Sequence, residues 1–286
     1  MNPVPLFLII VSLPLLLGGC GEKEVNSNLK YETKGDSITI TYCYKKASGA
    51  LIIPATIEGK SVTRIGAMAF YYCTNLTSIT IPDSVTSIGD HAFWECTSLI
   101  SITIPDSVTS IGDHAFRECT SLTSITIPDS VTSIGDSAFS NCTSLTSVTI
   151  GDSVTSIGDY AFGESNSLTS ITIGNSVTNI EDQAFWRCNS LTSITIGDNV
   201  TSIGGSAFAY CKSLTSITIP ESVTSIGRLA FRTCESLTAV TFLGDAPKEG
   251  KDIFYKASPT IYRKPEAKGW GDTFAGRPVK LISEKP

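Results

Sequence analysis

Hydrophobic and polar residues alternate in short runs that return every 23 residues along most of the chain. One such run covers residues 76–81, where Ile79 and Ile81 fall on one face and polar residues fall on the other. This period-two pattern in β-branched residues predicts a strand with one buried face. A second short extended piece is predicted over residues 85–88. A single helical turn is expected to follow from Asp90, whose carboxylate is suited to cap its free N–H groups.

A phenylalanine stands at the same place in every unit. Its positions are Phe70, Phe93, Phe116, Phe139, Phe162, Phe185, Phe208, Phe231 and Phe254, each 23 residues after the last. A fixed period of this length predicts a solenoid, because each unit buries its apolar face only against its neighbours. The residues expected to point inward in one coil are Leu76, Ile79, Ile81, Val85, Ile88, Ala92, Phe93 and Cys96. The predicted fold class is a β-rich solenoid with a strand and a short helical turn in each coil.

The two ends of the chain depart from the repeat and are predicted to cap it. We expect an N-terminal cap over residues 30–60, the repeats over residues 61–246, and a degenerate repeat with a C-terminal cap over residues 247–286. The tail carries Trp270 and Phe274. We expect these rings to seal the open end of the core, since a solenoid needs a closing element at each end.

The first residues read as a targeting segment. The apolar stretch over residues 4–17 is short and interrupted by prolines, so it is poorly suited to span a bilayer. Residues 1–19 are therefore predicted to be a secretory signal peptide. The run Leu-Gly-Gly-Cys that ends at Cys20 resembles a bacterial lipobox. This resemblance implies that Cys20 is lipidated, and residues 20–29 then form the linker to the fold.

The residue after the predicted lipidation site bears on localisation. Gly21, rather than Asp, follows Cys20. By resemblance to Gram-negative sorting, this favours the outer membrane or the cell surface. No Lys or Arg precedes the apolar stretch. Ordinary cleavage beside an incidental cysteine and a start codon assigned in the wrong place therefore stay open as alternatives.

The repeated unit has a recognisable sequence. Its segments Ala-Phe-x-x-Cys and Leu-Thr-Ser-Ile-Thr-Ile-Pro, over roughly residues 50–260, resemble the leucine-rich repeats of the BspA-like (Treponema pallidum-type) bacterial surface proteins. The resemblance implies a right-handed leucine-rich-repeat solenoid with a parallel strand in every coil. It also implies adhesion, or binding to proteins of a host or a neighbouring cell. The family associates no catalytic residues with the repeat, so none is carried over to this chain.

Charge is divided unevenly along the chain. Residues 61–246 hold 6 Lys and Arg against 17 Asp and Glu, a net charge of −11, whereas residues 247–286 hold 9 against 5, a net charge of +4. An acidic repeat body argues against nucleic acid as a partner. The chain has two histidines, no glycine-rich phosphate loop and no Gly-x-Ser-x-Gly motif. We therefore expect neither an enzyme nor a cofactor.

The repeat places cysteines, histidines and acids in columns. The repeat cysteines are Cys73, Cys96, Cys119, Cys142, Cys188, Cys211 and Cys234, and Ser165 interrupts the series. Stacked side chains point in parallel, which suits buried thiols better than disulfides or zinc. Zinc held by His91 and His114 with Glu95 and Glu118 stays a minor alternative. The acidic columns that begin at Asp83 and Asp90 are interpreted as turn and cap residues, with loose Ca²⁺ binding as the alternative.

Sequence variation within the array points to a binding surface. The outward strand positions are almost uniformly Ser and Thr, whereas the positions around each phenylalanine vary. Since Trp, Tyr and Arg dominate interface hot spots, this variable edge is the candidate site for a protein partner. The candidate residues are Tyr71, Tyr72, Trp94, Arg117, Tyr160, Trp186, Arg187 and Tyr210. Relaxed constraint on an exposed turn is the alternative explanation of the variation.

The sequence therefore predicts a monomeric, non-enzymatic, lipid-anchored protein that presents a leucine-rich-repeat surface for adhesion or protein binding. Two other functions stay open. The first is a periplasm-facing structural or scaffold lipoprotein without an external ligand. The second, a minor one, is ice binding through the regular Ser and Thr columns of the strands.

Overall fold

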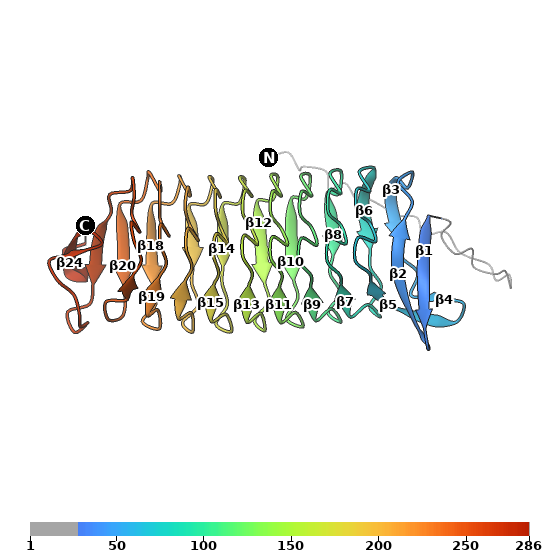
Figure 1. The fold of residues 1–286 in the computed structure, drawn as a ribbon, viewed down its shortest axis with the longest axis horizontal. Helices are drawn as coiled ribbons and strands as arrows, with labels where there is room; N and C mark the ends of the chain where they lie inside the picture. Colours follow the sequence, from blue (N-terminus) through green and yellow to red (C-terminus); the bar gives the residue numbers. More distant parts are fainter. Residues whose placement is uncertain (1–27, 286) are drawn as a thin grey trace, which may run out of the picture.

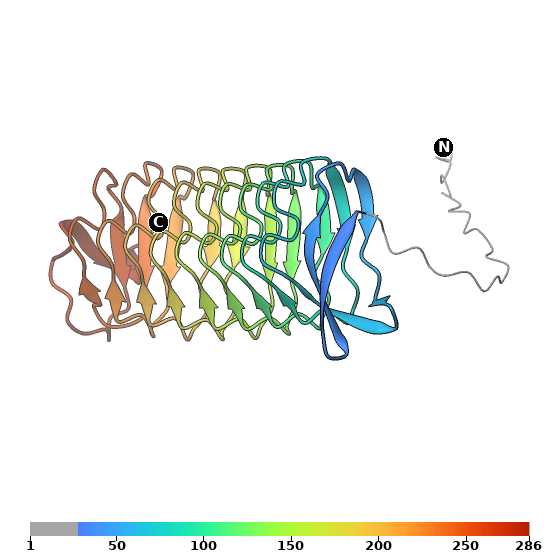
Figure 2. The same ribbon diagram turned by 45° about the vertical axis from the view of Figure 1, so that its right-hand side comes forward.

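The computed structural model describes residues 28–285 and shows an elongated solenoid, with its coils stacked along the long axis (Figures 1 and 2). The solenoid that the 23-residue period predicts is confirmed. The predicted signal peptide, residues 1–19, and the predicted lipidation site at Cys20 lie outside the described residues. Among residues 28–285, no helix has the length and apolar character needed to cross a membrane.

The first strand of each coil is the alternating Leu-x-Ser-Ile-Thr run. Each strand pairs in parallel with residues 23 positions away, as Ser124 does with Ser147. This register keeps the Ile or Val of each strand on the core face and the Ser and Thr on the opposite face. The strands are β6 (Leu76–Thr80), β8 (Ser101–Thr103), β10 (Ser124–Ile127), β12 (Ser147–Ile150), β14 (Ser170–Thr172), β16 (Ser193–Thr195), β18 (Ser216–Ile219) and β20 (Ala239–Phe242). The ladder divides after β8 and after β16.

The second strand of each coil has two residues and is followed by glycine in most coils. A Cβ atom on Gly112 would lie 2.7 Å from the backbone nitrogen of Asp90 in the preceding coil, so glycine allows the coils to approach. The strands are β7 (Ser87–Ile88), β9 (Ser110–Ile111), β11 (Ser133–Ile134), β13 (Ser156–Ile157), β15 (Asn179–Ile180), β17 (Ser202–Ile203), β19 (Ser225–Ile226) and β21 (Lys248–Glu249). They belong to one 12-stranded sheet.

The third side of each coil is built from hydrogen-bonded turns, and the predicted helical turn is wrong. Two residues per coil, such as His91 (φ 58°) and Glu95 (φ 57°), are left-handed, as in type II turns. A left-handed residue cannot continue a right-handed helix. The N–H of Phe93, between them, donates instead to the carbonyl of Ala115 in the next coil, over 2.7 Å. Asp90 therefore caps no helix.

The core is a column of phenylalanine rings. The ring centroids of successive coils lie between 5.0 Å apart, for Phe70 and Phe93, and 5.6 Å apart, for Phe231 and Phe254. All the residues predicted to point inward are buried, namely Leu76, Ile79, Ile81, Val85, Ile88, Ala92, Phe93 and Cys96. Each coil thus buries its apolar side chains against both neighbours, which a lone coil cannot do.

Irregular elements close both ends of the stack. The N-terminal elements are β1 (Leu29–Lys34), β2 (Ser37–Cys43), β3 (Gly49–Ile52), β4 (Thr56–Ile57) and β5 (Lys60–Ile65), and β1 and β2 are antiparallel. The C-terminal elements are β22 (Thr260–Arg263), β23 (Thr273–Phe274), β24 (Arg277–Leu281) and the 3₁₀ turn η1 (Ile282–Glu284). The rings of Trp270 and Phe274 lie 4.9 Å and 5.4 Å from that of Phe242 and cover the last coil, as expected.

Candidate functional site

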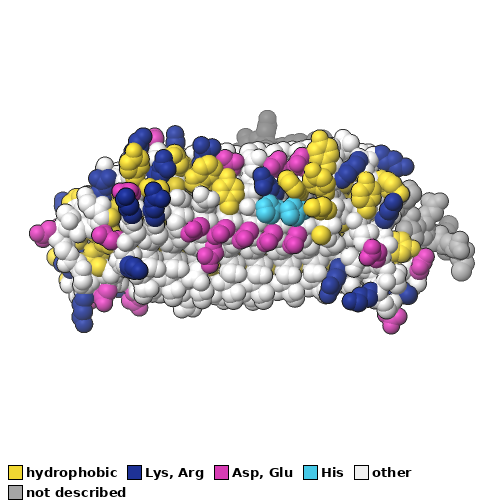
Figure 3. All heavy atoms as spheres, in the orientation of Figure 1, with side chains coloured by type: hydrophobic (Ala, Val, Ile, Leu, Met, Phe, Trp, Pro, Cys, Tyr) yellow, Lys and Arg dark blue, Asp and Glu magenta, His cyan; other side chains and the backbone are white. Residues whose placement is uncertain are grey.

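The variable turn residues form a row of side chains along one edge of the solenoid, which we call the aromatic edge. It is made of the predicted residues Tyr71, Tyr72, Trp94, Arg117, Tyr160, Trp186, Arg187 and Tyr210, all half-buried or exposed. Figure 3 shows their hydrophobic and basic side chains above the row of acids. The sequence predicts one continuous edge, but the structure divides it into two clusters.

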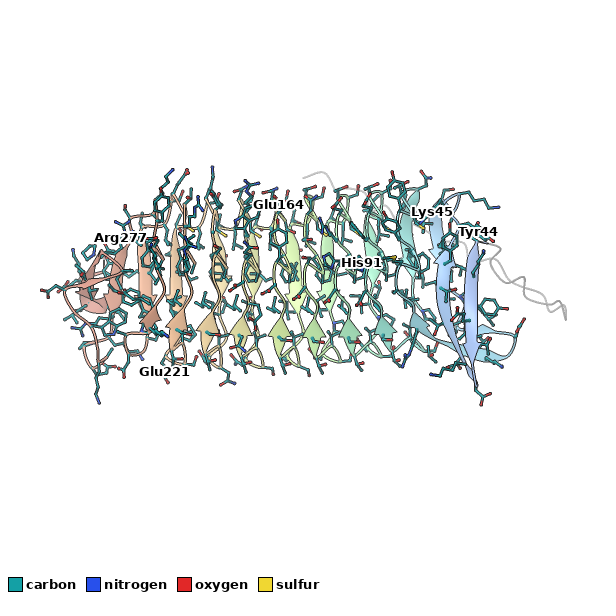
Figure 4. The ribbon with its side chains drawn as sticks, viewed as in Figure 1. Tyr44, Lys45, His91, Glu164, Glu221 and Arg277 are labelled. Atoms are coloured by element: carbon teal, nitrogen blue, oxygen red, sulfur yellow. The ribbon has the colours of Figure 1, made fainter. Side chains whose placement is uncertain are left out.

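The N-terminal cluster is centred on Trp94. The ring of Tyr71 lies 5.2 Å from that of Trp94 and 6.0 Å from that of Tyr72. The Arg117 guanidinium lies over Trp94 at 5.4 Å, and the Lys45 ammonium lies over Tyr71 at 5.0 Å. Cations over aromatic faces attract the ring quadrupole, so these contacts hold the rings in fixed positions. Lys45, which was not a predicted site residue, reaches this edge from the N-terminal end (Figure 4).

The C-terminal cluster is centred on Trp186. Its ring lies 5.7 Å from that of Tyr160 and 5.9 Å from that of Tyr210. The Arg187 guanidinium stacks on Trp186 at 4.2 Å and makes an ion pair of 3.2 Å with Glu164. Burial is the main cause that raises the pKa of Tyr160, to about 12, and the nearby Glu164 adds to it. The Tyr160 hydroxyl therefore stays neutral at physiological pH.

Small residues separate the two clusters, and the second cluster extends beyond the predicted residues. The intervening coils carry Ser140 and Gly163 in the place of the tryptophans. Beyond Tyr210, the Arg232 guanidinium lies 5.2 Å from its ring and 5.6 Å from the ring of Tyr255. Arg232 and Tyr255 were not among the predicted residues. Following the position after each phenylalanine through two further coils would have identified them.

The two histidines lie beside the N-terminal cluster but do not converge. The rings of His91 and His114 stack 4.7 Å apart, with an angle of 2° between their planes. Parallel rings present their nitrogens side by side, whereas zinc needs ligands that point to one centre. Burial is the main cause that lowers the pKa of His114, and His91 and Arg117 lower it further. In the described part of the chain, no three His, Cys, Asp or Glu residues are grouped as metal ligands.

The repeat cysteines are buried thiols with a shared hydrogen bond. The thiol of Cys119 donates to the carbonyl of Phe93, 26 residues earlier, at 3.2 Å, and Cys142 bonds Phe116 in the same way. Burial raises the pKa of Cys142 to about 12, so the thiol stays protonated. All cysteines of residues 28–285 are free in the structure. From Cys96 onward this column joins coils, and burial raises the pKa of its thiols.

The acidic columns also join coils. The carboxylate of Asp90 accepts the backbone N–H of Asp113 at 3.0 Å, and that of Asp129 accepts the N–H of Asp152 at 2.9 Å. Asn175 makes the same bond to the N–H of Asp198 at 2.9 Å. The shared feature is thus a side-chain oxygen that accepts a bond from the next coil. The structure supports a turn role for these acids but not a helix cap.

Many of the hydroxyls beside the strands bond the preceding coil. The hydroxyl of Thr146 donates to the carbonyl of Thr123 at 3.1 Å, and that of Ser130 donates to the carbonyl of Val108 at 2.6 Å. Over β8, β10 and β12 the strand face has an open hollow of about 800 Å³, which includes Asp129 in its lining.

Comparison with known proteins gives a consistent result. The family model for BspA type leucine rich repeat regions matches residues 41–167 and 132–260. A leucine-rich repeat protein of Treponema pallidum is similar, with 34% identity, 68% of this chain and 91% of that chain covered, and a TM-score of 0.63. One from Bacteroides ovatus has 26% identity, 90% and 76% coverage, and a TM-score of 0.62. No curated protein matches the chain. The chain belongs to the BspA-type leucine-rich repeat family.

Proposed function

We propose that this chain is an exported, lipid-anchored and non-enzymatic leucine-rich-repeat protein that binds a protein partner through the aromatic edge. One observation carries the proposal. The strand faces repeat the same Ser and Thr, whereas the aromatic edge gathers partly exposed Trp, Tyr and Arg side chains into two clusters. These residue types dominate the binding energy of protein interfaces.

The packing of the edge supports this function. Trp94 is held between Tyr71 and Arg117, and Trp186 is held between Tyr160 and Arg187. Side chains that are already ordered lose little conformational entropy when a partner binds. The edge is therefore a preorganised surface and not a set of mobile side chains.

The proposed anchor is Cys20, eight residues before the first described residue, Asn28. An extended chain of this length spans about 28 Å, at about 3.5 Å per residue. The N-terminal elements β1 and β2 lie at one end of the solenoid (Figure 2). An anchor at this end leaves the coils free to extend away from the membrane, with the aromatic edge accessible along its length.

The first test is the orientation of the protein. Intact cells are treated with protease, and this protein is followed together with a known periplasmic protein. Loss of this protein with the periplasmic control spared supports a surface role. Protection until the envelope is broken would remove adhesion and leave the periplasm-facing scaffold.

The second test is the site itself. The whole protein is used as bait, and the recovered partner is quantified for wild type, for a variant with Trp94→Ala and Trp186→Ala, and for a matched variant with Thr126→Ala and Thr149→Ala on the strand face. We expect the tryptophan variant alone to lose the partner, with its circular dichroism unchanged. Equal recovery by all three proteins would contradict the proposed site.

A further inference from the structure

One column of turn residues changes the sign of its charge along the solenoid. These residues stand three positions before each core phenylalanine, and we call them the charge column. From the N-terminal end they are Asp90, Asp113, Asp136, Asp159, Asp182, Gly205, Arg228 and Lys251. All except the half-buried glycine are exposed, and the five carboxylates form a continuous row on the face shown in Figure 3. This row runs beside the aromatic edge on the same face.

The charges of this column have no opposite charge beside them. Within residues 28–285, neither Arg228 nor Lys251 forms an ion pair, and neither do the aspartates of the column. Arg228 borders an open hollow of about 370 Å³ at Gly205, which Asp159 and Asp182 also line. A row of unpaired charges that is acidic at one end and basic at the other is complementary to its own copy turned by 180°. Such self-complementarity is the condition for an isologous two-fold interface.

We propose that this face pairs with the same face of a second copy in an antiparallel dimer. Lys251 of each copy lies opposite Asp136 of the other, and Arg228 lies opposite Asp159. The two-fold axis makes each of these pairs occur twice, so the interface contains four complementary charge pairs. Complementary charges of this kind select the partner and fix the register.

The register follows from the charges near the two-fold axis. In the proposed dimer the axis passes between Asp182 and Gly205, so Asp182 of each copy lies opposite Gly205 of the other. A shift of one coil toward the N-terminus places Asp182 opposite its own symmetry mate. Like charges that face each other repel, so this neighbouring register is disfavoured.

The C-terminal cluster lies at the centre of this interface. Trp186 faces Ala209 of the second copy, and Arg187 faces Tyr210, so a large side chain meets a small one and a cation meets an aromatic ring. The overlap covers six coils, from Phe139 to Phe254. At about 5 Å per coil, the contact is about 30 Å long. An interface of this length and the width of one edge is at the small end of the specific range, so the dimer is weak and reversible.

The geometry has a consequence that rests on the proposed anchor. In an antiparallel dimer, the two N-terminal ends lie at opposite ends of the pair. If each copy is anchored through Cys20, the anchors then belong to two facing membranes. Many weak pairs between two surfaces add through multivalency. The N-terminal cluster around Trp94 stays outside the overlap and is free to bind a different protein.

The test begins with the solution state of the whole protein. Sedimentation equilibrium in density-matched detergent should show a dimer at low salt that dissociates at high salt, because exposed charges are screened. Reversal of the basic pair, Arg228→Glu with Lys251→Glu, should raise the Kd at least about tenfold. The same reversal at Lys264 and Lys268, which lie outside the column, is the matched control and should leave the Kd unchanged.

A mixing experiment gives the decisive result. The variant with Asp136→Lys and Asp159→Lys should also fail to self-associate, and an equal mixture of the two reversed variants should form a heterodimer. Basic residues already occupy this position at Arg228 and Lys251, so the backbone accepts them, and circular dichroism checks the fold. A monomer at every salt concentration, or a dimer that the reversals do not weaken, would overturn the proposal.

A vesicle experiment separates the dimer from the proposed function. Vesicles that carry the lipidated wild-type protein should cluster, whereas vesicles that carry the Arg228→Glu, Lys251→Glu variant should not. If the protein dimerises in detergent but the vesicles do not cluster, the bridging of two membranes is contradicted and the antiparallel dimer is still supported. Failure of the dimer does not contradict the protein-binding edge, because a Trp94→Ala variant, whose site lies outside the overlap, measures recovery of the partner separately.

Discussion

The hydroxyl of Ser165 donates to the carbonyl of Phe139 over 2.9 Å and makes the bond that a cysteine thiol makes in the other coils. In the next coil, the thiol of Cys188 reaches the carbonyl of Phe162 over 3.2 Å. Both donors are buried. The position thus requires a small, buried hydrogen-bond donor, which can be a thiol or a hydroxyl. Ser165 in the cysteine series is therefore a conservative substitution.

This relationship predicts different results for two substitutions of Cys142. Cys142→Ser keeps a donor for the Phe116 carbonyl and should change the free energy of unfolding by less than about 0.5 kcal/mol. Cys142→Ala leaves that buried carbonyl without this donor and creates a small void, so it should cost about 1–2 kcal/mol. Urea unfolding followed by circular dichroism measures both. Equal losses for the two variants would contradict the role of the bond.

The phenylalanine column predicts that stability depends on position in the stack. Phe162 stacks on both Phe139 and Phe185, whereas Phe254 stacks only on Phe231. Phe162→Ala should cost about 3–5 kcal/mol, the usual range for a buried aromatic residue. Phe254→Ala should cost less, since it removes contacts on one side only. Unfolding in urea should rank the two variants in this order, and the reverse order would argue against the ring column as the main source of core stability.

The left-handed turn positions predict a stabilising substitution. Thr233 has a φ of 56°, which is unfavourable for a β-branched residue. Asn141, at the same place in another coil, has a φ of 57°, and asparagine tolerates this conformation. Thr233→Asn should therefore raise the free energy of unfolding by about 1 kcal/mol. Thr215→Asn, at an exposed position without positive φ, is the control and should give no such gain.

The raised pKa of Glu181 predicts that substitution of this residue changes thermal stability in a pH-dependent way. Burial is the main cause that raises its pKa, and Asp159, Asp182 and Asp136 raise it further. A carboxyl with a raised pKa stabilises the fold when protonated, and this stability is lost as the pH rises through the raised value. Glu181→Gln should therefore raise the melting temperature at pH 7 and have little effect below about pH 4.

The control for Glu181 is Glu235, which is exposed and lies 3.8 Å from the Lys212 ammonium. Glu235→Gln loses an attraction and not a repulsion, so it should not raise the melting temperature at pH 7. Thermal unfolding of both variants between pH 3.5 and pH 7 gives the comparison. A Glu181→Gln effect that is the same at every pH would show that its charge is not the cause.

The solenoid, its period and its core could be predicted from the repeat pattern of the sequence alone. Ile79, Phe93 and Cys96 are predicted inward and are buried, because the alternating pattern states which face of a strand is apolar. The same unit in every coil also fixes the parallel register, since a slip would move all these side chains out of the core. Local pattern and packing between coils agree here, which is why this part of the fold is predictable.

The turn conformation and the contacts within the aromatic clusters depend on neighbouring coils, so the sequence did not predict them. The N–H of Phe93 bonds the carbonyl of Ala115 instead of its own coil, so the expected helical turn becomes a pair of left-handed turns. Stacking likewise decides which side chains meet inside each cluster of the edge, with Arg117 over Trp94 and Arg187 over Trp186. A bond or stacking contact to a neighbouring coil leaves no local pattern in the sequence, since its geometry exists only when the coils are stacked.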